Sequence, residues 1–260
     1  MPRTRMQRGP TMRTLRMTLA YVGTTYAGWQ VQPARATIQG ILERTLARML
    51  DEPIRIVGAG RTDAGVHALG QVASFTTTRS IPLYGLRRGL NARLPETLRV
   101  LAVDEVAEGF NARSDARGKD YRYRISTAEV LSPFEAPFVT QVVAVLDAAA
   151  MAAAAERLVG THDFTSFCRA DSSIEDRRRT LRRSRVIADG ATVTYDVHGD
   201  GFMRHMIRTI VGTLVDAGRG RIAPHDVDAI LAARDRRRAG VCMPARGLTL
   251  MKVHYDTEAA

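Results

Sequence analysis

Apolar and polar residues alternate in several short segments of the chain, which is the pattern of a strand with one buried face. Large apolar side chains fill every second position from Leu15 to Tyr21, and the same period recurs over residues 193–197. Residues 54–57, 70–75 and 251–255 also carry the β-branched and aromatic residues that favour strands. The pattern therefore predicts at least five strands.

Apolar residues three and four positions apart predict helices between these strands. Thr37 is a suitable cap for a helix over residues 38–49, and an Ala-rich segment predicts a second helix over residues 147–159. A broad apolar face over residues 203–214 predicts a third helix, and Pro224 is placed to begin a fourth. Helices and strands thus alternate along the whole chain.

Both halves of the chain repeat the same coarse order of strand, helix and further strands. A proline-containing segment over residues 131–137 predicts the connection between the halves. The start of the chain is rich in arginine and has no acidic residue, which is typical of a mobile basic tail. We therefore expect an α/β (α+β) fold with a tail at 1–14 and lobes at 15–130 and 138–257.

The net charge of the chain limits the kinds of partner that it is expected to bind. Its 260 residues include 38 basic and 27 acidic side chains, a balance of +11, while the hydrophobic content of 45% supports a real core. Such a surplus attracts polyanions. Nucleic acid is the leading candidate partner and an anionic membrane surface is the second.

The chain shows no targeting or metal-binding pattern. No apolar run approaches the roughly 18 residues of a membrane span, and no apolar signal-peptide core follows the basic start. Cys168 and Cys242 lack the spacing of a zinc or redox motif. We expect a cytoplasmic protein with reduced cysteines and with no metal or cofactor.

One short segment is dominated by arginine. A run of positive charge is usually a solvated face, but in a chain with this surplus it is also a candidate for contacts with phosphate groups. We take Arg178 and Arg182 as the predicted RNA contacts. The arginines of the segment are Arg177, Arg178, Arg179, Arg182, Arg183 and Arg185.

The most informative segment is a glycine-rich loop over residues 57–67 that carries Arg61 and Asp63. It has three interpretations. It is a surface turn with an Arg–Asp pair, a phosphate-binding loop, or a site with a catalytic carboxylate that a neighbouring cation keeps ionised. The phosphate loop is disfavoured, because no Lys-Ser/Thr pair is present and the residues after Gly65 favour an extended conformation.

Two further segments place aromatic and basic residues in regular patterns. In a strand, Tyr121, Tyr123 and Ile125 share one face, and the intervening arginines share the other. An aromatic face suits base stacking as well as an ordinary core. In the helix over 203–214, Arg204 and Arg208 lie one turn apart beside the apolar face, where snorkelling arginines are the ordinary alternative.

The loop sequence GAGRTDAGVHA (residues 58–68) resembles the signature of the TruA family of tRNA pseudouridine synthases over eleven consecutive positions. Other matching segments run from about residue 15 to 255. Val22 and Thr209 depart from the family pattern, which usually has Asp and Asn at these positions. The matching segments are YVGTTYAGWQ (21–30), FNARSDA (110–116), THDFTSF (161–167), GFMRHMIRTIVG (201–212) and PARGLTL (244–250).

This resemblance implies a pseudouridine synthase fold, in which two similar lobes of mostly antiparallel sheet, flanked by helices, surround a basic cleft. It also assigns the catalytic residues. Asp63 matches the catalytic carboxylate of the family, and Arg208 matches the arginine that pairs with it. Tyr121 matches the tyrosine that packs against the target base.

The resemblance further implies which residues contact RNA. Leu248 matches a residue that lines the pocket, Arg113 belongs to a segment near the RNA, and Arg61 is expected to position the flipped nucleotide or its phosphate. Family relatives are homodimers that bind tRNA across both subunits and need no cofactor or metal. We therefore expect a homodimer that binds the anticodon stem-loop of tRNA.

The implied reaction is the isomerisation of uridine to pseudouridine at tRNA positions 38, 39 and 40, with the base flipped out of the stem. One alternative is a non-catalytic RNA-binding or RNA-remodelling protein with the same basic cleft. Asp63 separates the two, because an anion in an RNA cleft weakens simple binding. An Asp-nucleophile hydrolase lacks support, since the chain has no carboxylate pair of the required spacing.

Overall fold

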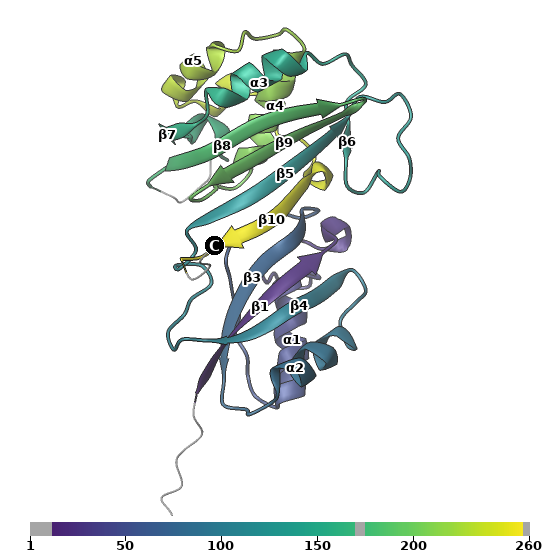
Figure 1. Cartoon of the computed structure of the whole chain (residues 1–260), viewed down its shortest axis with the longest axis vertical. Coiled ribbons are helices and arrows are strands. Elements are labelled where there is room, and N and C mark those ends of the chain that lie inside the picture. The colour runs from purple at the N-terminus through teal and green to yellow at the C-terminus, as the bar shows by residue number, and fades with distance from the viewer. Residues whose placement is uncertain (1–11, 170–174, 257–260) are drawn as a thin grey trace, which may run out of the picture.

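The structure is a computed structural model that describes residues 12–169 and 175–256, and it is built on one sheet. The strands are β1 Arg13–Tyr21, β2 Val57–Gly58, β3 His67–Thr77, β4 Leu98–Val106, β5 Gly118–Ser126, β6 Thr140–Gln141, β7 Gly160–Asp163, β8 Arg178–Asp189, β9 Thr192–Gly199 and β10 Leu248–His254. Figure 1 shows the sheet running through both halves of the molecule, in the order β4-β1-β3-β10-β5-β9-β8-β7. The short strand β2 pairs with β3, and the short strand β6 pairs with β5.

The four predicted helices all form, and the described residues contain one further helix, Leu83–Asn91. Thr37 caps the first helix by accepting a hydrogen bond from the Gly40 amide, and Asp147 caps the third by accepting one from the Ala150 amide. The helices are α1 Ile38–Leu50, α2 Leu83–Asn91, α3 Ala148–Glu156, α4 Met206–Gly218 and α5 Asp226–Ala233. Short 3₁₀ turns lie at Gly23–Thr25, Thr165–Phe167, Arg236–Arg238 and Ala245–Gly247. None of the helices in the described ranges is long and apolar enough to cross a bilayer.

The central strand of the sheet is the last one in the chain. β10 pairs in parallel with β3, where Thr249 lies opposite His67, and antiparallel with β5, where Leu250 lies opposite Tyr121. Figure 1 shows β10 between the β1–β3–β4 group, with α1 and α2, and the β5–β9–β8 group, with α3 to α5. The predicted α/β fold of mostly antiparallel strands flanked by helices is confirmed, although one continuous sheet serves both halves.

The lobe boundaries at 15–130 and 138–257 stay a prediction. β5 belongs by sequence to the first of these ranges, but it pairs with β9 and β10 of the second. Residues 1–11 of the expected tail lie outside the described residues. The end of that tail was predicted wrongly, because Arg13 and Thr14 pair with Thr77 and Thr76 in β1–β3.

The strand predicted over residues 54–57 is also wrong, apart from Val57. Ile54 and Ile56 are buried, but residues 54–56 belong to no strand. Side chains of α1 satisfy this backbone instead: the Glu43 carboxylate accepts a hydrogen bond from the Ile56 amide, and the Gln39 side chain donates one to the Ile56 carbonyl. An apolar extended segment can therefore lie in the core without a strand partner.

Candidate active site

The loop between β2 and β3 is fixed by hydrogen bonds on both sides of Asp63. The Trp29 amide donates to the Thr62 carbonyl at 3.1 Å, and the Gln71 side chain donates to the Gly60 carbonyl at 2.8 Å. The Val66 amide closes the turn by donating to the Asp63 carbonyl. The backbone is thus held by the core while the Asp63 side chain stays half-buried and open to a ligand.

The glycines of the loop allow this close packing. Trp29 is only 2% exposed, and its ring lies directly against Gly58. A Cβ at Gly58 would lie 2.4 Å from two carbons of that ring. Gly65 has a φ of +80°, which side chains disfavour. A tight loop on a buried aromatic ring needs both glycines.

The Asp63 carboxylate forms its shortest ion pair with α4. Nη1 of Arg208 lies 3.2 Å from Oδ2 of Asp63, and both side chains are largely shielded from solvent. Nε of Arg208 donates to the Met243 carbonyl at 2.6 Å. The guanidinium is therefore held at two of its edges, which fixes its direction toward Asp63.

Two further basic side chains approach the same carboxylate from the start of α4. Nε of Arg204 lies 3.8 Å from Oδ1, and Nε2 of His205 lies 3.7 Å from Oδ2. Arg61 is exposed and has no ion pair with Asp63 within the described part of the chain. The two arginines at Asp63 thus come from α4 and the residues just before it rather than from the loop.

His205 was not among the predicted site residues. Its φ of +66° places it in the left-handed region, and it immediately precedes α4, which begins at Met206 rather than at residue 203. Burial lowers the pKa of His205, and the charges of Arg208 and Arg204 lower it further, against the opposing effect of Asp63. Its place in the GFMRHMIRTIVG segment, between Arg204 and Arg208, was the available signal.

Tyr121 lies on the buried face of β5, as the alternation predicts. Its ring meets the Phe202 ring edge-on at a centroid distance of 5.2 Å. A Cβ at Gly60 would lie 3.9 Å from the Tyr121 hydroxyl, so the 57–67 loop passes the hydroxyl end of this ring. Burial raises the pKa of Tyr121, and its proximity to Tyr21 and Asp63 adds to the rise. The phenol therefore stays protonated at neutral pH.

Comparison with known proteins shows which family this chain belongs to. A family model described as tRNA pseudouridine synthase matches residues 17–113 and 154–256. This chain belongs to the tRNA pseudouridine synthase family. Asp63, Arg208 and Leu248 lie inside the matched ranges, whereas Tyr121 lies between them.

Several relatives carry the name tRNA pseudouridine synthase A. The proteins of Pelobacter propionicus and Geobacter sulfurreducens are 45% and 46% identical over 244 residues, which is 94% of this chain and 100% of each relative. The protein of Brevibacillus brevis is 46% identical over the same extent. The predicted resemblance is thus confirmed over nearly the whole chain.

Lys119 is a second residue of the site that the sequence prediction did not assign. It lies two residues before Tyr121, and its side chain runs past the loop, since a Cβ at Gly60 would lie 3.3 Å from its Cε. Burial lowers the pKa of Lys119, and the charges of Arg113 and Arg179 lower it further, while Asp200 opposes them. Arg113 therefore lies near this edge of the synthase site.

The remaining predicted contacts are distributed more widely. Leu248 is buried opposite Tyr123, in the strand next to Tyr121. Arg178 and Arg182 are exposed on β8, and neither pairs with Asp63 in the ranges 12–169 and 175–256. The structure thus brings Asp63, Arg208 and Tyr121 together and leaves these two arginines on a peripheral strand.

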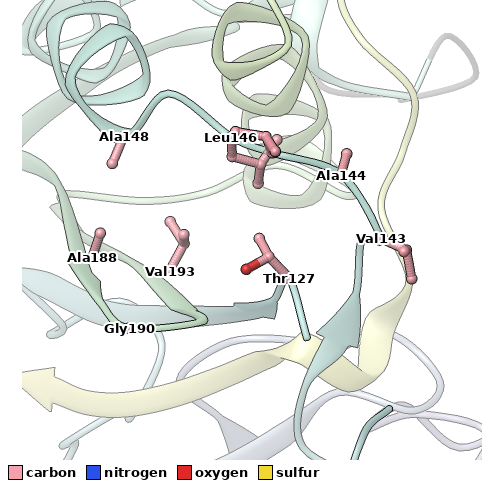
Figure 2. Close-up of a pocket in the computed structure, with 9 residues that line it drawn as sticks. Thr127, Val143, Ala144, Leu146, Ala148, Ala188, Gly190 and Val193 are labelled. Atoms are coloured by element: carbon pink, nitrogen blue, oxygen red, sulfur yellow. The ribbon is translucent and has the colours of Figure 1, made fainter. Parts of the chain in front are cut away.

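A separate hollow of about 460 Å³ lies at the start of β9, where Val193 lines it. Figure 2 shows side chains of the 143–148 segment facing Thr127 and Val193 across it. Its lining is mainly Val, Ala and Leu, and none of the predicted site residues takes part. It is therefore not part of the candidate active site.

Proposed function

We propose that this chain isomerises uridine to pseudouridine at positions 38, 39 and 40 in the anticodon stem-loop of tRNAs. The observation that carries the proposal is the half-buried Asp63 carboxylate, held by Arg208 beside the buried ring of Tyr121. The names of the relatives support tRNA as the substrate. The specific positions rest on the resemblance of the motifs.

The reaction rearranges bonds within one nucleotide. The N1–C1′ bond breaks, the uracil turns, a C5–C1′ bond forms, and the proton lost from C5 is balanced by one gained at N1. An ionised carboxylate serves this reaction either as the nucleophile at C1′ or as the base for a sugar proton. Asp63 is suited to both roles, because Arg208 holds its carboxylate in place.

The neighbouring residues have distinct roles in the proposal. The hydrogen bond from Nε of Arg208 to the Met243 carbonyl fixes the guanidinium. The fixed guanidinium in turn orients the Asp63 carboxylate. Tyr121 presents its ring to the uracil, and its protonated phenol makes it a packing surface and a hydrogen-bond donor rather than an anionic base. The exposed Arg61 positions the flipped nucleotide or its phosphate.

The wider surface serves RNA binding in this proposal. The net charge of +11 favours a polyanion, and Arg113, Arg178 and Arg182 are exposed and available to phosphate groups. We also propose a cytoplasmic homodimer whose tRNA contacts both subunits. An RNA-binding protein without catalysis explains the charge equally well, but it gives no reason to hold an anion at Asp63.

The decisive experiment is tritium release from a tRNA transcript whose uridines are tritiated at C5, because the reaction expels the C5 hydrogen. Wild type, Asp63→Asn and the control Asp189→Asn would be compared, Asp189 being exposed on β8. We expect release by wild type and by the control, and loss of release with retained tRNA binding in Asp63→Asn. Binding without release by wild type would overturn the isomerase and favour the RNA-binding protein.

A further inference from the structure

Three potential metal ligands meet on the sheet face opposite Tyr121. Asp120 precedes Tyr121 in β5, so its side chain points to the other face. His198 of β9 is its direct partner in the strand register, and His254 of β10 lies opposite Gly118, two residues before Asp120. The three residues are distant in sequence but occupy adjacent positions on three adjacent strands.

Both histidines point at the same carboxylate. Nδ1 of His198 lies 2.8 Å from Oδ1 of Asp120, and Nε2 of His254 lies 2.6 Å from Oδ2. One ligand atom from each residue can be chosen so that all three lie within 4.8 Å of one another. The group is also shielded, since the side chains of Asp120, His198 and His254 are only 18%, 20% and 33% exposed.

We propose that Asp120, His198 and His254 form a binding site for a divalent transition-metal ion of the zinc type. Two imidazole nitrogens and one carboxylate are ligands that such ions accept, with water completing the coordination. Binding needs a lone pair on each facing nitrogen, so the proton of His198 moves to Nε2 and that of His254 moves to Nδ1. The two hydrogen bonds to Asp120 are then replaced by metal bonds.

Gly118 supports this arrangement of His198. A Cβ at position 118 would lie 2.8 Å from Cε1 and 3.0 Å from Nε2 of the His198 ring. Any larger residue would therefore displace the ring from its present position. The absent side chain at position 118 leaves the space that the imidazole occupies.

Arg183 is the group that opposes a metal ion. Its Nη2 lies 3.0 Å from Oδ1 of Asp120, and a cation there competes with a bound metal. The Arg183 side chain is 54% exposed, so it is free to turn into solvent when the metal enters. Its removal should therefore strengthen metal binding, which a purely structural hydrogen-bond cluster does not predict.

This inference goes beyond the proposed isomerisation, whose candidate site lies on the opposite face of the sheet. A bound ion would tie β5, β9 and β10 together directly behind Tyr121. Hard ions such as Mg²⁺ prefer oxygen ligands and should bind poorly at two imidazoles. The site would therefore discriminate zinc from the magnesium that accompanies tRNA.

Calorimetric titration of the untagged, metal-free full chain with ZnCl₂ tests the site. We expect one ion per chain for wild type, and no comparable binding of Mg²⁺. His198→Gln and His254→Gln keep a hydrogen-bond donor near Asp120 but remove the imidazole. Each should weaken binding by at least about 10-fold, since loss of even an outer-shell partner of a metal ligand costs that much. The control is His225→Gln, whose exposed imidazole lies outside the cluster.

Arg183→Gln gives an independent test at an exposed position that does not endanger the fold. We expect it to bind zinc more tightly than wild type, because a competing charge is gone. The inference is overturned if wild type does not bind zinc. It is equally overturned if the two cluster variants bind it as tightly as His225→Gln, or if Arg183→Gln leaves the affinity unchanged.

Discussion

Arg208 and Asp63 are 145 residues apart in the chain, and their side chains meet with Nη1 3.2 Å from Oδ2. Arg208 donates at the same time to the Met243 carbonyl at 2.6 Å. A planar guanidinium can serve both acceptors at once, whereas an ammonium group has no such fixed geometry. The pairing therefore depends on the shape of arginine as well as on its charge.

Arg208→Lys should lower kcat by about 10- to 100-fold with a smaller change in KM, because it keeps the charge but loses the orientation of Asp63. Steady-state tritium release from tRNA measures both constants. Arg204→Lys is the matched control, since Arg204 is 3.8 Å from Asp63 and mostly exposed. Equal losses in the two variants would contradict a special role for Arg208.

His205 combines a functional position with an unusual backbone. Its φ of +66° is costly for most residues but tolerated by asparagine. His205→Asn and His205→Ala should both lose activity, by up to about 100-fold in kcat, because loss of the imidazole disturbs the placement of Asp63. Only His205→Ala should also lose about 1 kcal/mol of stability through the backbone.

Urea unfolding, measured on the same variants as tritium release, separates the loss of activity from the loss of stability at His205. Full activity in His205→Asn would show that the imidazole contributes only to the conformation at the start of α4. A stability loss of the same size in both variants would instead contradict the backbone explanation.

Burial of His67 predicts a loss of stability at acidic pH. Its Nδ1 accepts a hydrogen bond from the Gly23 amide at 3.1 Å, and burial lowers its pKa below the ordinary 6.5. The unfolded chain then binds more protons than the folded chain, so the free energy of unfolding should fall as pH drops from about 6.5. His205 has a lowered pKa as well and acts in the same direction.

Urea unfolding at pH 8, 6 and 5 measures this dependence. His67→Gln should flatten it, since the glutamine oxygen can still accept from Gly23 but does not titrate. His225→Gln is the control, because that side chain is exposed and should leave the dependence unchanged. A variant at His67 with the full acid dependence of wild type would contradict the assignment.

Replacing Gly58 by alanine should lower the free energy of unfolding, whereas replacing Gly85 by alanine should raise it. The added methyl group at Gly58 would meet the buried Trp29 ring at 2.4 Å, and overpacking of this kind costs about 1–3 kcal/mol. At Gly85, inside α2, it meets nothing within 4 Å and should stabilise the helix by about 0.5–1 kcal/mol. Urea unfolding of both variants checks the signs, and a neutral Gly58→Ala would contradict the packing against Trp29.

The sequence by itself determined the local elements of this protein. Alternation placed Leu15–Tyr21 inside β1, spacing of three and four placed residues 38–49 inside α1, and Thr37 marked where that helix begins. The motif around Asp63 indicated the family, which the comparisons confirm. These features depend on neighbours within a few positions, so they are visible in the order of residues.

The tertiary structure alone decided how these elements meet. Only the pairing of β10 with β3 and β5 makes one sheet and brings Asp63 beside Tyr121. Only the folded backbone shows His205 in the left-handed region. The convergence of Asp120 with His198 and His254, 78 and 134 residues away, has no counterpart in the spacing of the sequence. Strand order and long-range contacts depend on the burial of whole faces, which no local pattern records.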